Sequence, residues 1–481
     1  MVFSTILFLF RFLPITLALY YLAPAKLKNT VLFLCSLVFY CWGEVRFFPI
    51  MIALILLNYL CGLGLERFDG SEPARKFFLL AGLVGSLGML FYFKYANFVL
   101  SSANALLGTS FSPIQGISTL PLGISFYTFQ TLSYTIDVYR RDVKTEHNII
   151  DFGAYVVMFP QLIAGPIVKY RDVSAQLHVT HGRYNLKQIE DGMTLFTFGL
   201  AKKVLLADTI GALWTDIIGI ADSPSTTFVG LANASTALVW LGVIAYSLQL
   251  YFDFSGYSMM AIGMGKMLGF DFPQNFNYPY ISRSITEFWR RWHISLGSWF
   301  RDYVYIPLGG SRVRLGRWVL NLLVVWGLTG LWHGAAWTFV LWGLYFAVFL
   351  LLEKLFLGRL LRRLPVLRHV YVLTAALFSF VLFDASSLSA AIGAAGSMLG
   401  LGHLPVWDGG TLYYLHSYAP VLLAAAVGST PLPAALCRRI AAGRAGRVLD
   451  ALEPAALLAL LAVCTAFLVS GSANPFLYFR F

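Results

Sequence analysis

Charged side chains are scarce in this sequence. Only 12% of its 481 residues are Asp, Glu, Lys or Arg, and 58% are hydrophobic. In an ordinary soluble protein about 25% of the residues are charged. The few charged side chains cannot cover a globule of this size. Much of the apolar surface must therefore face something other than water. Disorder is excluded as well, because it requires low hydrophobicity and high net charge. The composition therefore predicts a protein whose main solvent is lipid.

Motifs of soluble metal and redox proteins are also missing. The five cysteines are odd in number and form no CxxC pair, which argues against a disulfide framework or a cysteine zinc site. We expect no metal at His178 and His181 either, because the sequence places no evident carboxylate or cysteine beside them. No Walker A loop, GxSxG elbow or HExxH pair occurs. We therefore expect neither ATP-driven transport by this chain alone nor a bound cofactor.

Apolar stretches recur along the whole chain. A transmembrane helix needs about 20 apolar residues, and several stretches are shorter, which indicates tilted or re-entrant helices. Met1–Leu22 has Arg11 in mid-run, so we expect a retained helix rather than a signal peptide. With no internal repeat, the pattern predicts one all-α integral membrane domain over residues 1–481 with about 10–12 helices. The later stretches are roughly 31–43, 47–64, 77–95, 119–136, 151–167, 189–206, 232–252, 256–270, 318–353, 370–385, 411–436 and 451–471.

Lysine and arginine cluster between the apolar stretches, as in the cytoplasmic loops of membrane proteins. We therefore attribute the net charge of +12 to membrane orientation, with donor capture as a further role, and not to nucleic-acid binding. Windows without Lys or Arg predict the outer side: 95–139, 204–265, 369–437 and 448–479. The basic segments are Lys26–Lys28, Arg67–Lys76, Arg140–Arg171, Arg283–Arg317, Lys354–Arg368 and Arg438–Arg447.

One interval departs from simple spanning. The 36 residues between Arg317 and Lys354 contain no Lys or Arg, yet both ends read as cytoplasmic. Two full spans need about 40 residues and a turn, so we expect a tight hairpin of short helices or a broken, re-entrant pair. Gly327, Gly330 and Gly334 in its middle permit a break and a close backbone approach.

His333 lies in this interval, 16 residues from Arg317. That separation gives about 24 Å of helical reach. Ionisable groups at membrane depth are costly, so they are functional candidates by default. A neutral imidazole there can act as a general base toward a hydroxyl nucleophile. The alternative is a structural histidine hydrogen-bonded between helices, and spacing alone does not separate the two.

Residues 285–300 predict an amphipathic helix at the cytoplasmic interface. Tryptophans and His293 share one face, and Arg290 and Arg291 lie mostly on the other. Interfacial anchoring explains the tryptophans and arginines but not a histidine on the aromatic face. The loop that follows, Arg301–Arg312, could offer basic groups and backbone amides to a phosphate-bearing donor.

Asp253 is an acid in the aromatic run Gln249–Tyr257, so it needs a partner. It could orient a histidine, pair with an arginine or serve a structural role. Other polar groups near apolar stretches are more often contacts between helices than functional sites. These groups are Gln130, Tyr134, Asp137 and Gln161.

Three motifs resemble the membrane-bound O-acyltransferase superfamily: FWRRWH (Phe288–His293), YIPLGG (Tyr305–Gly310) and GLWHGAAW (Gly330–Trp337). Within it the chain is similar to the alginate O-acetyltransferase branch. The motifs are specific as a set, and the likeness runs from Met1 to Phe481. Further matching segments are LPLGISFYTFQ (Leu120–Gln130), FPQLIAGP (Phe159–Pro166), FDFSGY (Phe252–Tyr257), PQNFNYP (Pro273–Pro279) and NPFLYFRF (Asn474–Phe481).

The resemblance implies a ring of tilted transmembrane and re-entrant helices around a central channel. It makes His333 the central catalytic residue and His293 a second, less central one. Met259 is a departure, because the family usually carries an acid there. Further residues of the matching motifs are candidates for donor binding or for the channel: Asp253, Trp332, Arg290, Arg291, Asn275 and Tyr305.

The resemblance also implies a reaction. A cytoplasmic thioester, acetyl-CoA or another, would supply an acetyl group that crosses the bacterial inner membrane. A periplasmic or surface acetyltransferase of the SGNH, esterase-like type would then place it on an exopolysaccharide, either alginate-like or another secreted or cell-wall glycan. The expected partners are that acetyltransferase, the polysaccharide export machinery and membrane lipid, with no nucleic acid.

Two other functions remain open from the sequence. One keeps acyl transfer but changes the substrate, to D-alanylation of teichoic acid or to acylation of a lipid or sterol. The other is a transporter or channel, which explains the spans and a histidine at depth equally well. Transporters often carry paired internal repeats with broken helices in both halves. One unusual hairpin and no repeat argue against that class.

Overall fold

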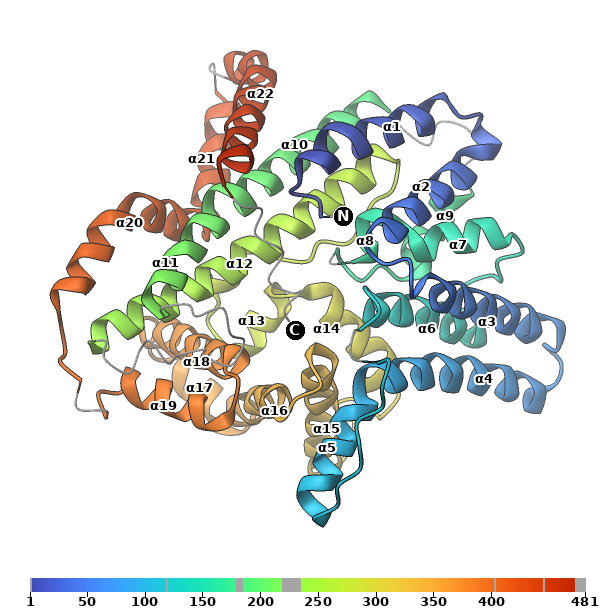
Figure 1. The fold of residues 1–481 in the computed structure, drawn as a ribbon, viewed down its shortest axis with the longest axis horizontal. Helices are drawn as coiled ribbons and strands as arrows, with labels where there is room; N and C mark the ends of the chain where they lie inside the picture. Colours follow the sequence, from blue (N-terminus) through green and yellow to red (C-terminus); the bar gives the residue numbers. More distant parts are fainter. Residues whose placement is uncertain are drawn as a thin grey trace. The chain divides into compact units, whose positions relative to one another are not determined.

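All regular secondary structure in the described part of the chain is helical (Figure 1). The computed structural model describes residues 2–117, 120–163, 165–178, 185–218, 235–401, 404–443 and 446–471. The all-α prediction is therefore confirmed. The closing motif Asn474–Phe481 lies outside the described residues.

Seven helices in the described ranges are long and apolar enough to cross a membrane, and a bent pair, α20 with α21, makes an eighth. The helix at 446–470 is strongly apolar, yet only 6% of its most apolar window is buried, so its surface faces lipid. The protein is thus a multi-pass membrane protein, as predicted. The spans are Phe48–Arg67, Glu72–Leu107, Thr236–Met267, Leu315–His333, Trp337–Leu361, Leu367–Asp384 and Gly446–Ser470.

Two further apolar helices are shorter, Phe8–Leu22 and Leu388–Met398. They bring the number of apolar helices in the described ranges close to the predicted 10–12. That prediction counted re-entrant helices together with full spans. The ring and the central channel implied by the resemblance stay predictions.

The chain divides into two compact units, residues 1–196 with 257–274, and residues 197–256 with 275–481. It passes between them after Phe196, Gly256 and Gln274, so α12 contributes to both. The single domain predicted over residues 1–481 stays a prediction. The first unit contains α1 (Leu13–Leu22), α2 (Lys28–Gly43), α3 (Phe48–Arg67), α4 (Glu72–Leu90), α5 (Ala96–Leu107), α6 (Ile124–Arg140), α7 (Ile149–Val157), α8 (Phe159–Leu162), α9 (Tyr170–Leu177) and most of α10 (Leu186–Ala201).

Helices α3, α4 and α6 lie side by side in the first unit (Figure 1), and polar side chains join them. Asn58 of α3 donates to the Ser86 hydroxyl of α4 at 2.9 Å and accepts from the Thr135 hydroxyl of α6 at 2.7 Å. All three side chains are buried. Hydrogen bonds of this kind hold membrane helices together where no hydrophobic driving force acts between them. Tyr134, predicted as such a contact, lies on the same helix and accepts a hydrogen bond from the backbone N–H of Glu146.

The second unit carries the predicted functional motifs. Its helices α16, η8 and α17 form one continuous span. The helices are η4 (Lys202–Ala207), α11 (Asp208–Ile218), the first part of α12 (Thr236–Met267), α13 (Ile285–Arg291), α14 (Ile294–Phe300), η7 (Arg301–Tyr305), α15 (Leu315–His333), α16 (Trp337–Leu352), η8 (Glu353–Leu357), α17 (Gly358–Leu361), α18 (Leu367–Asp384), α19 (Leu388–Met398), α20 (Gly409–Gly428), α21 (Leu432–Ala441) and α22 (Gly446–Ser470).

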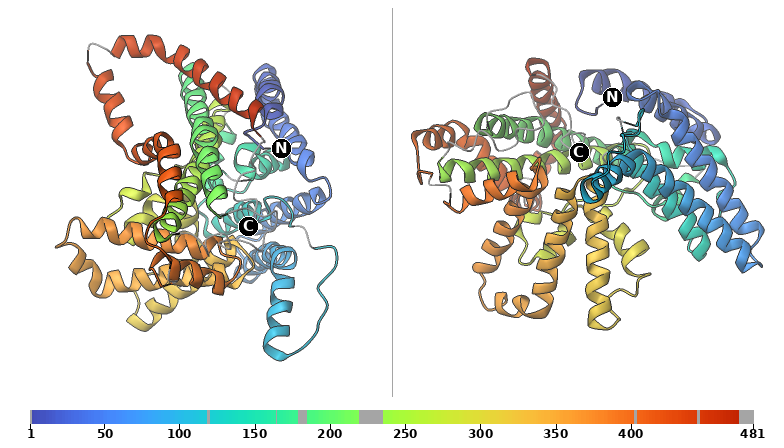
Figure 2. Two further views of the ribbon diagram at one scale, coloured as in Figure 1. Left: turned by 60° about the vertical axis from the view of Figure 1, so that its left-hand side comes forward. Right: turned by 60° about the horizontal axis from the view of Figure 1, so that its bottom comes forward.

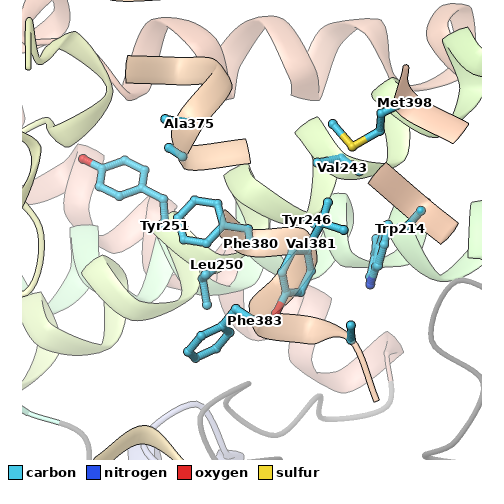
Figure 3. Packing of buried hydrophobic residues seen from close by; sticks show 14 of the residues in the cluster. Trp214, Val243, Tyr246, Leu250, Tyr251, Ala375, Phe380, Val381, Phe383 and Met398 are labelled. Carbon is cyan, nitrogen blue, oxygen red and sulfur yellow. The ribbon is translucent and has the colours of Figure 1, made fainter. Parts of the chain in front are cut away.

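A large apolar core in this unit fixes α12 against its neighbours (Figure 3). Trp214 of α11 packs on Tyr246 of α12 with ring centroids 5.1 Å apart. The indole N–H of Trp240 donates to the Met398 carbonyl of α19 at 2.9 Å. Phe380 of α18 belongs to the same buried cluster. These contacts pack α12 and α18 into one core, and both helices reach the candidate site.

Candidate active site

Glycines close the hairpin between α15 and α16. A Cβ atom added at Gly330 would lie 2.2 Å from the Phe339 carbonyl oxygen, and one at Gly343 would lie 2.1 Å from that of Trp326. No residue larger than glycine fits at either position without moving backbone. Small residues at such contacts let membrane helices approach closely. The GLWHG motif is therefore also a packing motif, because it brings His333 to the tip of this hairpin.

The predicted hairpin is confirmed, but its description as short or broken is wrong. The first helix begins before Arg317, and the second runs on to Leu361, so the candidate spans are 19 and 25 residues long. The sequence pattern understated both lengths because it stopped at the basic residues. Long basic side chains can remain within a helix end and extend their charge into water.

His333 is the last residue of α15, so about 27 Å of helix separates it from Leu315. The reach predicted from the sequence is confirmed. Its side chain is only 6% exposed. Three aromatic rings meet the imidazole edge-on, those of Trp332, Trp342 and Phe383, with centroid distances of 5.0, 4.9 and 5.4 Å. Such surroundings exclude water and strengthen electrostatic interactions at the imidazole.

His293 lies at a break between two short helices, so the prediction of one continuous amphipathic helix is wrong. Helix α13 ends at Arg291, and α14 begins at Ile294. Between them His293 has φ of 46° and ψ of 52°, a left-handed conformation that non-glycine residues seldom adopt. Two long-range hydrogen bonds hold it there: Ile294 N–H donates to the Asn275 carbonyl at 3.0 Å, and Asn277 N–H donates to the Arg291 carbonyl at 2.9 Å. The periodicity of apolar residues within one segment cannot predict a break that depends on hydrogen bonds to an earlier segment of the chain.

The hydrogen bonds of Asn275 identify the tautomer of His293. The amide Oδ1 accepts from Ser295 N–H at 3.2 Å and from its hydroxyl at 2.9 Å, so this atom is an oxygen. Nδ1 of His293, 3.2 Å from the same oxygen, must then donate. Nε2 therefore carries the lone pair, and it is buried without a hydrogen-bond partner among the described residues. Burial lowers the pKa of His293, which lies outside the candidate spans, to about 3, so the ring is neutral at pH 7.

The two histidines lie together, with ring centroids 6.3 Å apart. Trp332 contacts both rings, 5.0 Å from His333 and 5.8 Å from His293. Phe254 of α12 packs edge-on against His293 at 4.7 Å. Of the predicted site residues, the structure thus brings Asn275 and Trp332 to the pair. A neutral imidazole in dry aromatic surroundings is suited to take a proton from a hydroxyl group.

The other candidates from these motifs make different contacts. Arg291 pairs with Glu287 at 2.9 Å, one turn back on α13, while Arg290 is exposed. The Tyr305 hydroxyl accepts from the indole N–H of Trp318 at 3.1 Å. Within the described part of the chain, none of these three candidates has a hydrogen bond or ring contact with either histidine. Their roles in donor binding stay predictions.

Asp253 has a lysine as partner, where the sequence suggested a histidine or an arginine. Its carboxylate lies 2.8 Å from Nζ of Lys203, which also contacts Asp208 at 2.6 Å. Lys203 and Asp253 are only 2% and 1% exposed. A buried charge is tolerated when it is paired in this way. Asp253 therefore has a structural role in this network, and its part in the channel stays a prediction.

Two neighbours of His333 were not identified from the sequence. Trp342 follows it by nine residues, and the helical spacing of the hairpin offered a weak signal. Phe383 follows by 50 residues on α18 and offered none. In the sequence, both residues look like ordinary apolar members of a membrane-spanning stretch. Only the packing of α16 and α18 turns them into walls of a site.

The expectation that His178 lacks a carboxylate companion is wrong. Its Nε2 lies 2.9 Å from Glu146, and Asp151 completes a group whose ligand atoms lie within 4.8 Å of one another. The loop before α7 and the end of α9 meet here, which sequence spacing does not show. Glu146 also accepts from the Tyr170 hydroxyl at 2.7 Å. This hydrogen bond favours a structural role for the pair of Glu146 and His178. His181 lies outside the described residues, and the absence of a metal stays a prediction.

These features define a class: an integral membrane protein of apolar helices that buries a pair of histidines under aromatic side chains. The sequence matches the membrane-bound O-acyltransferase family over residues 76–390, a range that contains both histidines. The chain belongs to this family. It is thus an acyltransferase of the membrane, and the recognition made from its motifs is confirmed.

Three relatives cover most of the chain. A protein of Azotobacter vinelandii named "Probable alginate O-acetylase" is 43% identical over 412 residues, which are 85% of this chain and 80% of that protein. A protein of the same name from Pseudomonas aeruginosa is 45% identical over 395 residues, 81% of this chain and 73% of its own length. The peptidoglycan O-acetyltransferase of Helicobacter pylori is 33% identical over 436 residues, 83% of this chain and 80% of its own.

Proposed function

We propose that this chain moves acetyl groups from a cytoplasmic thioester donor for the O-acetylation of an exopolysaccharide at the bacterial inner membrane. The observation that carries the proposal is the buried pair of His293 and His333, 6.3 Å apart in aromatic surroundings. The named relatives are probable alginate O-acetylases and a peptidoglycan O-acetyltransferase, and both polymers are glycans, which supports a polysaccharide acceptor. Acetyl-CoA or another acyl thioester is the donor.

In the proposed reaction His333 is the general base. It takes the proton from an acceptor hydroxyl as that oxygen attacks the thioester carbonyl carbon. The tetrahedral intermediate collapses, its carbon–sulfur bond breaks, and the thiolate recovers the proton from the imidazolium. The acetyl group thus moves from sulfur to oxygen, and His333 returns to its neutral form.

In this proposal Asn275 stabilises the oxyanion of that intermediate. Its Oδ1 accepts hydrogen bonds from His293 and Ser295. Its Nδ2 is buried and has no acceptor among the described residues, although buried donors are usually paired. A preorganised donor in a dry site stabilises developing negative charge strongly. Asn275 would thus serve both the tautomer of His293 and the reacting carbonyl.

The acetyl group would reach the polymer through a second protein. A periplasmic or surface acetyltransferase of the SGNH, esterase-like type would receive the acetyl group and place it on the polymer beside the export machinery. D-alanyl transfer to teichoic acid, or acyl transfer to a lipid, uses the same chemistry with a different donor or acceptor. The donor and the acceptor that the purified protein uses would distinguish these alternatives from acetyl transfer.

Acetyl transfer by the purified protein tests the function. We expect the protein in detergent to release free thiol from acetyl-CoA labelled in the acetyl group, and to pass the label to the partner acetyltransferase, which then places it on a glycan hydroxyl. D-alanyl thioester on a carrier protein, supplied in parallel, should remain intact. Transfer from the D-alanyl thioester alone would establish the other substrate. No transfer from any thioester, together with solute flux in vesicles, would establish a transporter.

Replacing His293 by alanine should leave partial activity. The ring supports the site but is not the base, so the transfer rate should fall by less than about 10²-fold, the lower limit for loss of a general base. Initial rates with labelled acetyl-CoA measure this. His416→Ala, at an exposed position on α20, is the control and should match the parent. A loss as complete as that of a His333 variant would reverse the order of the two histidines.

A further inference from the structure

A pocket rich in positive charge lies where the α16 span ends and the α18 span begins. It has a volume of about 330 Å³. Four basic side chains line it, those of Arg283, Lys354, Arg362 and Arg368. Arg283 comes from the segment before α13, and Lys354 comes from η8. Arg362 lies in the connection between the two spans, and Arg368 lies in the first turn of α18. Figure 2 shows α16 and α18 running side by side and joined at one end through α17.

The charge of this pocket is not balanced by its one acid. The Glu353 carboxylate is buried and accepts from the backbone N–H of Ile285, and from the backbone N–H and hydroxyl of Thr286 at 3.0 and 2.7 Å. It therefore joins the start of α13 to the end of the span. No ion pair within 4 Å joins any of the four basic side chains to a described carboxylate, although Glu287 lies near Arg283 and accepts from its backbone N–H at 2.9 Å. Nε of Arg368 is buried without an acceptor among the described residues. The pocket thus offers an excess of positive charge to an anion.

The position of the pocket in the fold indicates which kind of anion would bind there. The span Trp337–Leu361 ends here, and the span Leu367–Asp384 begins here, so the pocket lies at the depth of lipid headgroups. The sequence also assigns this basic segment to the cytoplasmic side, where anionic lipids gather. Beside it Leu355, Phe356 and Leu360 are 50%, 57% and 53% exposed. These side chains can contact acyl chains.

We propose that this pocket binds the phosphate-bearing headgroup of an anionic phospholipid. Its volume is near the lower end of the range for ligand pockets, about 300–1,000 Å³, which suits a headgroup with its acyl chains outside. The guanidinium groups of Arg362 and Arg368 can each give two hydrogen bonds to phosphate oxygens. Because Glu353 anchors α13, an occupied pocket would hold this helix against the end of the α16 span. The inference does not depend on acyl transfer.

Lipid binding to the delipidated full-length protein in detergent tests this proposal. Native mass spectrometry with phosphatidylglycerol and phosphatidylcholine should show preference for the anionic lipid. In the pair Arg362→Gln with Arg368→Gln, affinity for phosphatidylglycerol should fall by about 30-fold, from about 1 kcal/mol for each basic residue near the surface. The matched control pair, Arg438→Gln with Arg439→Gln, removes the same charge from α21 and should bind as the parent does.

A second pair, Lys354→Gln with Arg362→Gln, changes exposed side chains only, so it separates lipid binding from folding. It should weaken binding similarly. Equal binding of both lipids, or equal loss in the α21 control, would overturn the proposal. So would displacement of phosphatidylglycerol by inorganic phosphate or by adenosine 3′,5′-bisphosphate at equal concentration. That result would assign the pocket to a soluble phosphate or to the donor.

Discussion

Acetyl transfer should be abolished when His333 is replaced by alanine, with the rate falling by about 10²–10⁴-fold as expected for loss of a general base. The residue terminates α15 at the tip of the glycine-packed hairpin, where Trp342 and Phe383 contact its ring. His293 is buried as well, but the resemblance assigns the central catalytic role to His333. The measurement is the initial rate of label transfer from acetyl-CoA by the purified variant.

The packing of His333 calls for a second variant. Alanine leaves a space among aromatic rings, which could lower stability and confuse the result. His333→Gln nearly preserves the volume but has no titratable nitrogen, so it should be as inactive as the alanine variant. Gel filtration and thermal unfolding in detergent should show both variants folded. Activity of His333→Gln within a few-fold of the parent would remove His333 from the role of base.

Replacing Lys203 by methionine should destabilise the second unit by about 3–5 kcal/mol, the usual cost of removing one partner from a buried ion pair. Asp208 and Asp253 both lie within 3 Å of its Nζ atom. Without that cation, the buried Asp253 carboxylate faces that of the partly exposed Asp208, and their repulsion adds to the desolvation cost. Thermal unfolding of the detergent-solubilised protein measures the loss.

The control and the rescue for Lys203 come from the same chain. Lys266 pairs with Asp271 at 2.8 Å, but both side chains are partly exposed, so Lys266→Met should cost less than about 1 kcal/mol. Adding Asp253→Asn to Lys203→Met removes one of the opposed charges and should restore much of the stability. If Lys203→Met unfolds at the temperature of the parent, the network does not contribute to stability.

Much of the site was predictable because its main signals are local. His333 stood out as an ionisable residue in a long interval without basic residues, and glycines beside it indicated close packing. The resemblance added Asn275 and Trp332, which the structure places against His293. Wrong predictions arose where distant segments decide. The break at His293 depends on Asn275, 18 residues away, and the partner of Asp253 lies 50 residues earlier in the chain.

By itself the sequence determined the solvent of this protein, because a shortage of charge depends on composition alone. It also predicted the side of each loop from the placement of Lys and Arg. It also determined the family, and it predicted the central histidine, because the motifs are short and contiguous. Only the tertiary structure decided the aromatic surroundings of His333, the left-handed backbone and tautomer of His293, and the basic pocket between α16 and α18. Each of these arises from contacts between residues far apart in the chain, and no local period or motif specifies such contacts.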